Sequence, residues 1–305
     1  MIIAIIDMGT NTFNLLVAQT SGAILHESKL PVKLGEGGFT DKRLTPEAMH
    51  RAYNAINAHL NTAKDLGATQ YYAFATSAVR DASNGQIFVS EIKQRFNIDV
   101  EVISGDREAE LIWKGVNAAV DLGESPAVVV DIGGGSNEAI IANSEQIFWL
   151  HSFNLGVTRI AECFPISDPI TTRELATIEN FMLQTVEPLL LAAANLNPKV
   201  MAGSSGAFDS FRKILARKGI IHETSKVSAE IPVDEYLKLH HFFITSTHAQ
   251  RLALPGLDPI RVDLIIPASI FVNLLVQKLG IKKMFQSDYA LKEGFWVELS
   301  NKDKG

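Results

Sequence analysis

Two segments of this sequence resemble each other closely enough to indicate a duplicated fold. Each is a continuous β-branched and aliphatic run that ends in an aspartate and a glycine-containing turn, at residues 3–11 and 128–137. Such runs are typical of buried strands, and the apolar sequence after each turn predicts a hairpin that returns along the same sheet. The two aspartates, Asp7 and Asp131, are 124 positions apart, which is about the length of one domain. We therefore expect two similar α/β domains that face each other.

The boundary between the domains is expected in the short polar stretch 123–126, because proline and small polar residues between apolar elements are typical of linkers. The 305 residues then divide into an N-terminal domain of residues 1–124 and a C-terminal domain of residues 125–305. Each is long enough to bury its own core. We expect the last helix, from Ser287 onward, to pack back on the first domain.

Strands and helices alternate along the chain. Strands are expected at residues 71–75 and 100–103, between segments with helical periodicity. Thr171 and Glu174 have the spacing of a capping box, and they predict the start of one long helix that ends before Pro198. This alternation indicates mixed α/β domains.

Charge and composition exclude several classes of protein. Lysine and arginine number 28 and aspartate and glutamate 34, so the net charge of −6 is not that of a general nucleic-acid binder. The one cysteine, Cys163, excludes an intrachain disulfide and a cysteine-based zinc site. The most apolar stretch, residues 264–276, is interrupted by Pro267 and polar residues, and it falls short of a membrane span. We expect a cytoplasmic protein that binds neither nucleic acid nor membranes.

The two aspartate and glycine turns predict a phosphate site. Backbone N–H groups in glycine turns approach anions closely, and an aspartate at a strand end holds a divalent cation or its water. One such turn is usually only a hairpin turn. Matching turns at Asp7 and Asp131 instead favour one phosphate site to which each domain contributes half. A third turn, residues 203–206, is either a further source of backbone donors or a structural turn.

Two further segments carry candidate catalytic side chains. Residues 103–111 read as the end of a strand and the start of a helix. Glu108 in this segment has two possible roles. It either complements the dipole of a helix that Ser104 caps, or it acts as a general base at the N-terminus of that helix. Arg80 follows another predicted strand, and it is either a surface partner of Asp81 or a donor to a phosphoryl transition state.

Taken in order, these segments resemble those of the exopolyphosphatase and guanosine pentaphosphate phosphohydrolase family. The matching segments cover essentially the whole chain: 7–11, 34–37, 75–80, 103–116, 131–138, 203–206 and 287–294. The family belongs to the actin, sugar-kinase and Hsp70 superfamily. The resemblance therefore implies an α/β fold of two ribonuclease H-like domains, with mixed sheets flanked by helices and an interdomain cleft. The internal repeat indicates the same architecture independently.

The resemblance also implies a role for each matching residue. Glu108 matches the catalytic glutamate that orients and deprotonates the attacking water, and Arg80 matches an arginine that contacts phosphate. Asp131 and Glu138 match acidic residues that hold Mg²⁺ or another divalent cation, and Asp7 is expected beside them. The residues expected to bind phosphate oxygens are Asn11, Thr10, Gly133, Gly134, Gly135, Ser136 and Ser205.

The sequence departs from the family pattern at three positions. Arg107 stands where an acidic residue is common, and we expect it to lower the pKa of Glu108 or to contact phosphate. Asn14 stands where an arginine or another larger residue is common, which puts one phosphate contact in doubt. Ala207 replaces a hydroxyl residue of the third turn.

The implied function is a Mg²⁺-dependent phosphohydrolase. It would remove the terminal phosphate of inorganic polyphosphate, of guanosine pentaphosphate, or of both, by in-line attack of water. Two alternatives stay open: an ATP-dependent kinase of the same superfamily, and a polyphosphate- or nucleotide-binding regulator without turnover. The chain is similar to the short, two-domain form of the family, and a homodimer is expected.

Overall fold

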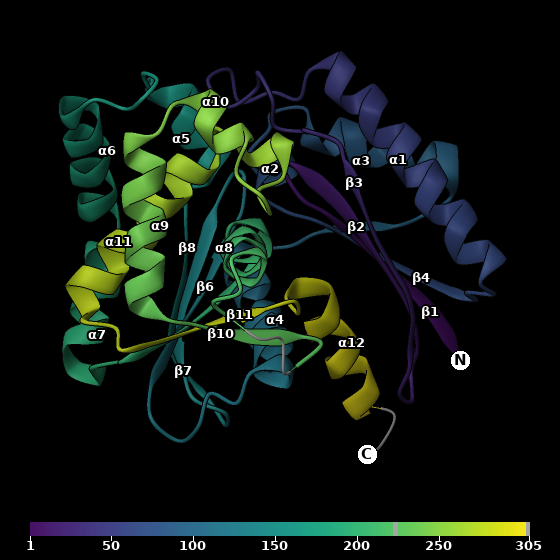
Figure 1. Cartoon of the computed structure of the whole chain (residues 1–305). Helices are drawn as coiled ribbons and strands as arrows, with labels where there is room; N and C mark the ends of the chain where they lie inside the picture. The colour runs from purple at the N-terminus through teal and green to yellow at the C-terminus, as the bar shows by residue number, and fades with distance from the viewer. Residues whose placement is uncertain (222–224, 303–305) are drawn as a thin grey trace.

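The strands of this protein form two mixed sheets in a computed structural model that describes residues 1–221 and 225–302 (Figure 1). The first sheet has the order β3-β2-β1-β4-β5. Its strands are β1 (Ile2–Met8), β2 (Thr12–Gln19), β3 (Ile24–Pro31), β4 (Gln70–Ala75) and β5 (Val100–Val102). The pairs β1–β2 and β2–β3 are antiparallel, whereas β1–β4 and β4–β5 are parallel.

The second sheet repeats the topology of the first. Its order is β10-β11-β9-β6-β7-β8, and its strands are β6 (Ala127–Ile132), β7 (Asn137–Ala142), β8 (Ile147–Phe153), β9 (Val200–Ser204), β10 (Ser228–Ile231) and β11 (Lys283–Ser287). The antiparallel strands β6, β7 and β8 correspond to β1, β2 and β3, and the parallel strands β9 and β11 correspond to β4 and β5. β10 is an additional antiparallel edge strand. The duplicated α/β fold predicted from the two similar segments is confirmed.

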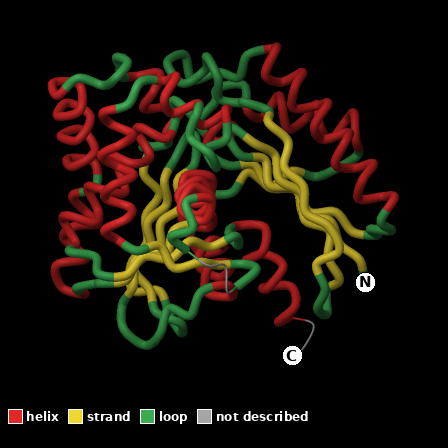
Figure 2. The backbone as a smooth tube through the Cα atoms, viewed as in Figure 1, coloured by secondary structure: helices red, strands yellow, loops and turns green. Residues whose placement is uncertain are grey.

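Helices cover the outer faces of the sheets and fill the space between them. They are α1 (Pro46–Asp65), α2 (Ser77–Arg80), α3 (Gly85–Phe96), α4 (Gly105–Ala119), α5 (Val157–Cys163), α6 (Thr172–Thr185), α7 (Glu187–Leu196), α8 (Ser205–Arg217), α9 (Val233–Thr245), α10 (His248–Leu252), the 3-10 helix η1 (Pro259–Arg261), α11 (Ile265–Leu279) and α12 (Leu291–Lys302). Figure 2 shows α1 and α3 outside the first sheet, with other helices between the two sheets.

An apolar core joins the two sheets. Ile5 of β1, Ile112 of α4 and Phe295 of α12 belong to one buried cluster that also includes Val129 of β6. Helix α12 contacts β1 and β2, and α4 contacts β7 and β8, while the two helices pack on each other. The sheets are therefore linked through packed helices, which fixes the space between them where the site lies.

Helices α4 and α12 approach each other closely because glycine lies at their crossing. A Cβ atom on Gly115 would lie 2.1 Å from the carbonyl oxygen of Ala290, and one on Gly294 would lie 1.8 Å from that of Leu111. Neither position has room for a side chain. The crossing places the start of α12 at the edge of the site.

The most apolar helix, α11, belongs to the core of the second sheet. Its Pro267 and Ser269 are buried, and the carbonyl oxygen of Ser269 accepts a hydrogen bond from the Tyr236 hydroxyl at 2.8 Å. Within residues 1–221 and 225–302, no helix has the length and apolarity needed to cross a membrane.

The segment between Thr171 and Pro198 forms two helices, and the prediction of one long helix is wrong. The capping box of Thr171 and Glu174 is present at the start of α6. The helix ends at Val186, and α7 follows with Pro188 in its first turn. Proline has no N–H group to donate to the preceding turn, and its ring collides with the carbonyl group there, so the helix breaks.

Candidate active site

A cleft of about 340 Å³ lies between the two sheets, where the equivalent strands β1 and β6 end. The turns that follow these strands form part of its wall, together with the N-terminus of α8 and the first turn of α4. Most of the predicted site residues line it: Asp7, Thr10, Asn11, Glu108, Asp131, Gly133, Gly134, Gly135, Ser136 and Ser205. The structure thus brings together side chains that lie far apart in the sequence.

Backbone N–H groups of both turns are free to bind an anion. In each turn the first glycine closes the hairpin: the Gly9 N–H donates to the Thr12 carbonyl at 3.1 Å, and the Gly133 N–H donates to the Ser136 carbonyl at 3.1 Å. The N–H groups without an acceptor among the described residues include those of Thr10, Asn11, Gly134 and Gly135. Successive free N–H groups in a tight turn form a concave anion site.

The two turns contact each other directly. The Thr158 hydroxyl donates to Asn11 Oδ1 at 2.8 Å, which links the second half of the molecule to the β1–β2 turn. A Cβ atom on Gly134 would lie 2.7 Å from Asn11 Nδ2. A side chain at this position would require the side chain of Asn11 or one of the two turns to shift.

Glu108 is a buried carboxyl group at the surface of the cleft. Its side chain is 9% exposed, and its Oε2 accepts a hydrogen bond from Arg80 Nη1 at 3.0 Å. Burial raises the pKa of Glu108 well above its usual value, and the charge of Glu138 acts in the same direction while Arg80 opposes both. A carboxylate with a raised pKa accepts a proton more readily, so Glu108 is suited to act as a general base.

Arg80 lies behind Glu108 and is not among the cleft-lining residues. Its Nη1 donates to Glu108 and also to the Ile103 carbonyl at 3.0 Å. Its distance to Asp81 is longer, at 4.0 Å. This arrangement orients the Glu108 carboxylate, and the direct phosphate contact implied by the resemblance stays a prediction.

Arg107 points away from the cleft, so neither expectation for it holds. Its guanidinium donates to Glu298 of α12 at 2.8 Å and to Glu110 at 3.3 Å. On a helix, residues one apart face different directions. Arg107 therefore stabilises the packing of α4 on α12, whereas Glu108 faces the site.

Asp7 and Asp131 present carboxyl groups from the two opposing sheets. Asp7 Oδ2 accepts from Asn14 Nδ2 at 2.8 Å, and Asp131 Oδ1 accepts from the hydroxyls of Ser204 and Ser205. Burial raises the pKa of both carboxyl groups, that of Asp7 to about 6, and these hydrogen bonds oppose the rise. The Ser205 hydroxyl thus binds Asp131, although Ser205 also lines the cleft.

Glu138 is buried beneath the cleft and does not line it. It is 1% exposed, and its Oε1 accepts from the Ser152 hydroxyl at 2.7 Å. Burial raises the pKa of Glu138 to about 7, and the charge of Asp131 adds to the effect. The three carboxyl groups expected to hold a metal thus do not all lie at the cleft surface.

The donors at the cleft fit a magnesium ion bound mainly by water and phosphate. Within the described residues, no group of three or more histidine, cysteine, aspartate or glutamate side chains is arranged to hold a metal ion. Mg²⁺ typically uses one or two carboxylates and takes its other oxygen ligands from water and substrate phosphates. Asp7 and Asp131 supply two such carboxylates.

Sequence reasoning missed two cations of the cleft, Lys29 and Arg261. Lys29 lies on β3, directly opposite Asn14 of β2. Arg261 ends η1 and covers the N-terminus of α8, where a Cβ atom on Gly206 would lie 1.1 Å from its Nη1. Neither residue belongs to a motif. No local sequence signal distinguishes either residue: the exposed and half-buried residues that alternate along β3 are seen only in the folded strand.

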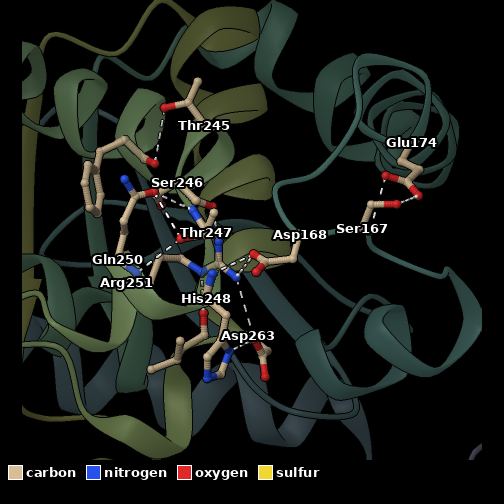
Figure 3. A network of polar contacts seen from close by, with 12 residues as sticks. Ser167, Asp168, Glu174, Thr245, Ser246, Thr247, His248, Gln250, Arg251 and Asp263 are labelled. Carbon is tan, nitrogen blue, oxygen red and sulfur yellow. Dashed lines mark hydrogen bonds and ion pairs between the residues drawn. The ribbon is translucent and has the colours of Figure 1, made fainter.

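The loop that carries Arg261 is held by the buried Arg251 of α10 (Figure 3). Arg251 is 2% exposed, and its Nε donates to the Val262 carbonyl at 3.0 Å. Its Nη2 lies 3.2 Å from Asp168 Oδ1 and 3.7 Å from Asp263 Oδ1. This network fixes a wall of the cleft from behind.

Comparison with known proteins agrees with this geometry. Residues 16–303 match the Ppx/GppA phosphatase family. Exopolyphosphatase 2 of Mycobacterium tuberculosis is 28% identical over 98% of each chain. A guanosine-5'-triphosphate,3'-diphosphate pyrophosphatase of Photobacterium profundum is 26% identical over 98% of this chain and 59% of its own length.

Solved structures extend the comparison to the fold. An exopolyphosphatase from Cytophaga hutchinsonii has a TM-score of 0.93 and 34% sequence identity, over 99% of this chain and 98% of that one. The Aquifex aeolicus member of the Ppx/GppA family has a TM-score of 0.81 at 20% identity, over 100% of this chain and 99% of that one, which supports the fold alone. The family match spans nearly the whole sequence, and the two-sheet architecture with its central cleft accompanies it, so this chain belongs to the Ppx/GppA phosphatase family.

Proposed function

We propose that this protein is a Mg²⁺-dependent phosphohydrolase that releases the terminal phosphate of inorganic polyphosphate, of guanosine pentaphosphate, or of both. The observation that carries the proposal is the position of Glu108, a buried carboxyl group at the surface of a cleft whose two turns leave backbone N–H groups free. The names of the similar proteins, exopolyphosphatase and guanosine-5'-triphosphate,3'-diphosphate pyrophosphatase, support the two substrates.

The free N–H groups position the terminal phosphate. Those of Thr10 and Gly134, with the N-terminus of α8, donate to its oxygens and stabilise the charge that spreads over them in the transition state. Glu108 accepts a proton from a water molecule as the water oxygen bonds to the terminal phosphorus. The bond from that phosphorus to the bridging oxygen breaks, and the electron pair stays with the shortened chain.

A divalent cation would lie between the two sheets. Asp7 and Asp131 are the residues that would hold it, and the buried carboxylate of Glu138 would add negative charge near it. When bound, Mg²⁺ neutralises phosphate charge and lowers the barrier to attack by an anionic or polarised nucleophile. Arg80 is a positioning residue that fixes the carboxylate of Glu108.

Free phosphate measured with purified protein tests the proposal. The substrates are long-chain polyphosphate, guanosine pentaphosphate and ATP, each with Mg²⁺ and after removal of metal by EDTA. We expect phosphate release from at least one of the first two, loss of release in EDTA, and recovery when Mg²⁺ is restored. Tight binding of these substrates without release would contradict the proposal in favour of a regulator, and transfer of phosphate from ATP to an acceptor would indicate a kinase.

The rate is expected to rise with pH. Because a general base must be deprotonated, protonated Glu108 is inactive, and its raised pKa moves the inactive range upward. Below that pKa, kcat/KM should fall about tenfold for each pH unit, and above it the rate should level off. The residual activity of Glu108→Gln should not show this fall in kcat/KM at low pH. An identical fall in the variant would mean that the substrate or another group, and not Glu108, causes it.

Gly134→Ala is expected to weaken substrate binding. The added Cβ atom would lie 2.7 Å from Asn11 Nδ2. Because Asn11 Oδ1 is held by the Thr158 hydroxyl, we expect the turns to shift and the amide donors to lose their alignment. A loss of one charge-assisted contact predicts about a tenfold rise in KM for polyphosphate. Titration calorimetry with tripolyphosphate measures the same loss directly, and unchanged affinity would show that the turns adapt.

Two sequence predictions concern the protein in the cell. We propose a cytoplasmic location, in keeping with the single cysteine. The homodimer stays a prediction, which sedimentation of the purified protein would test.

A further inference from the structure

Lys29 occupies a defined place in the row of residues that crosses the first sheet. Asp7 pairs with Asn14, and Asn14 pairs with Lys29, so the three residues lie side by side on β1, β2 and β3. Directly paired residues project from the same face of a sheet, and neighbouring strands are about 4.8 Å apart. Lys29 therefore lines the same cleft as Asp7, two strands away from it.

The Lys29 ammonium makes no hydrogen bond or ion pair with the described residues, although the charges of Asp209 and Asp7 act on it from a longer range. The nearby carboxylates already have donors. Asp7 accepts from Asn14 at 2.8 Å, and Glu27, the next residue on this face of β3, pairs with Lys292 at 2.9 Å. Asp131 accepts from two serine hydroxyls.

A second cation faces Lys29 across the cleft. Arg261 comes from η1 on the side of the second sheet, and both residues line the cleft. Lys29 is exposed to solvent in the cleft, but partial desolvation by the surrounding protein lowers its pKa, and the charge of Arg261 lowers it further. Arg261 has partial compensation from Asp209 at 4.0 Å. The charges of Asp209 and Asp7 offset part of this effect on the pKa of Lys29. Two cations that face each other across a cleft repel, and an anion between them removes that repulsion.

We propose that Lys29 is a specificity-determining residue that binds a phosphate group of the substrate other than the one released. The inference rests on the proposed function and adds a second phosphate position to the cleft, on the β3 side. Lys29 lies on β3, two strands from Asp7, whereas the free N–H groups and Glu108 belong to other elements, so it holds the part of the substrate that remains after cleavage. The ligand class is a condensed phosphate with at least one phosphate beyond the scissile bond, which both polyphosphate and guanosine pentaphosphate provide.

Steady-state kinetics of three variants test this role. Lys29→Met keeps the aliphatic stem and removes the charge, whereas Lys29→Arg keeps the charge. The control, Lys93→Met, removes an exposed lysine of the outer helix α3 that pairs with Asp99. We expect Lys29→Met to raise KM for polyphosphate and for guanosine pentaphosphate by about 10- to 100-fold, with kcat within about threefold of wild type. Lys29→Arg should restore most of the affinity, and Lys93→Met should match wild type.

The outcomes separate this inference from the proposed function. An unchanged KM in folded Lys29→Met, or a fall in kcat alone, would overturn the role in binding. An effect on one substrate only would support the inference and assign the position to that substrate. If wild type releases no phosphate, calorimetry with tripolyphosphate still decides: weaker binding by Lys29→Met supports the inference, and equal binding overturns it.

Discussion

Glu108→Gln is expected to lower the rate of phosphate release by a factor of about 10² or more. Glutamine has the shape of glutamate, and its side-chain oxygen still accepts the hydrogen bond from Arg80 that Glu108 Oε2 accepts at 3.0 Å. It accepts no proton from water, so the attacking nucleophile loses its base. Binding of polyphosphate should stay within a few-fold of wild type, because the N–H groups of the turns are unchanged.

A matched control lies on the same helix. Glu110 is 46% exposed and pairs with Arg107 at 3.3 Å, so Glu110→Gln removes the same charge from α4 outside the cleft and should retain wild-type turnover. Glu108→Gln should also unfold no earlier than wild type, because burial disfavours the charged carboxylate that it replaces. A folded Glu108→Gln protein with near wild-type turnover would remove Glu108 from the mechanism.

Arg251→Met is expected to destabilise the protein by about 3 kcal/mol. The methionine fills part of the space but leaves the carbonyl oxygens of Ser246 and Val262 without their donor. The loss of stabilising interactions is smaller for Asp168 and Asp263, because their side chains are 45% and 70% exposed and water replaces the guanidinium. Urea unfolding monitored by circular dichroism measures the change in the free energy of unfolding.

An exposed arginine provides the comparison for this substitution. Arg173→Met on α6 should change the free energy of unfolding by no more than about 0.5 kcal/mol. Because Arg251 also holds the loop that presents Arg261 to the cleft, folded Arg251→Met should bind polyphosphate more weakly. Stability equal to wild type would show that the buried arginine network contributes little to holding this wall.

The sequence is sufficient to predict the residues whose position follows from the backbone. Asp7 and Asp131 end apolar runs that can only be buried strands, and the duplicated topology then requires the two turns to meet at one cleft. Glu108 follows from the cap at Ser104, which fixes the start of α4 and therefore the face that the glutamate presents. These positions depend on local sequence patterns together with one global feature, the duplicated topology of the two sheets.

Other features depend on packing that no local pattern specifies. Arg107 turns toward Glu298 because α12 returns to cover α4, a contact between residues 191 positions apart. Glu138 lies beside Asp131 on the neighbouring strand, since the two pair directly across β6 and β7, and the packing around it buries it away from the cleft surface. Lys29 enters the site from an edge strand without a motif, which becomes visible only when the register of three strands is known.

Phosphate release in ¹⁸O-labelled water tests the central claim most directly. Wild-type protein with Mg²⁺ and long-chain polyphosphate should produce free phosphate that carries oxygen from the solvent, with no label in the shortened chain, because water attacks the terminal phosphorus. Glu108→Gln, still bound to polyphosphate, should produce almost none. Wild type that binds polyphosphate without releasing labelled phosphate, or a variant that releases it as fast as wild type, would contradict the assignment of this cleft as a hydrolytic site with Glu108 as its base.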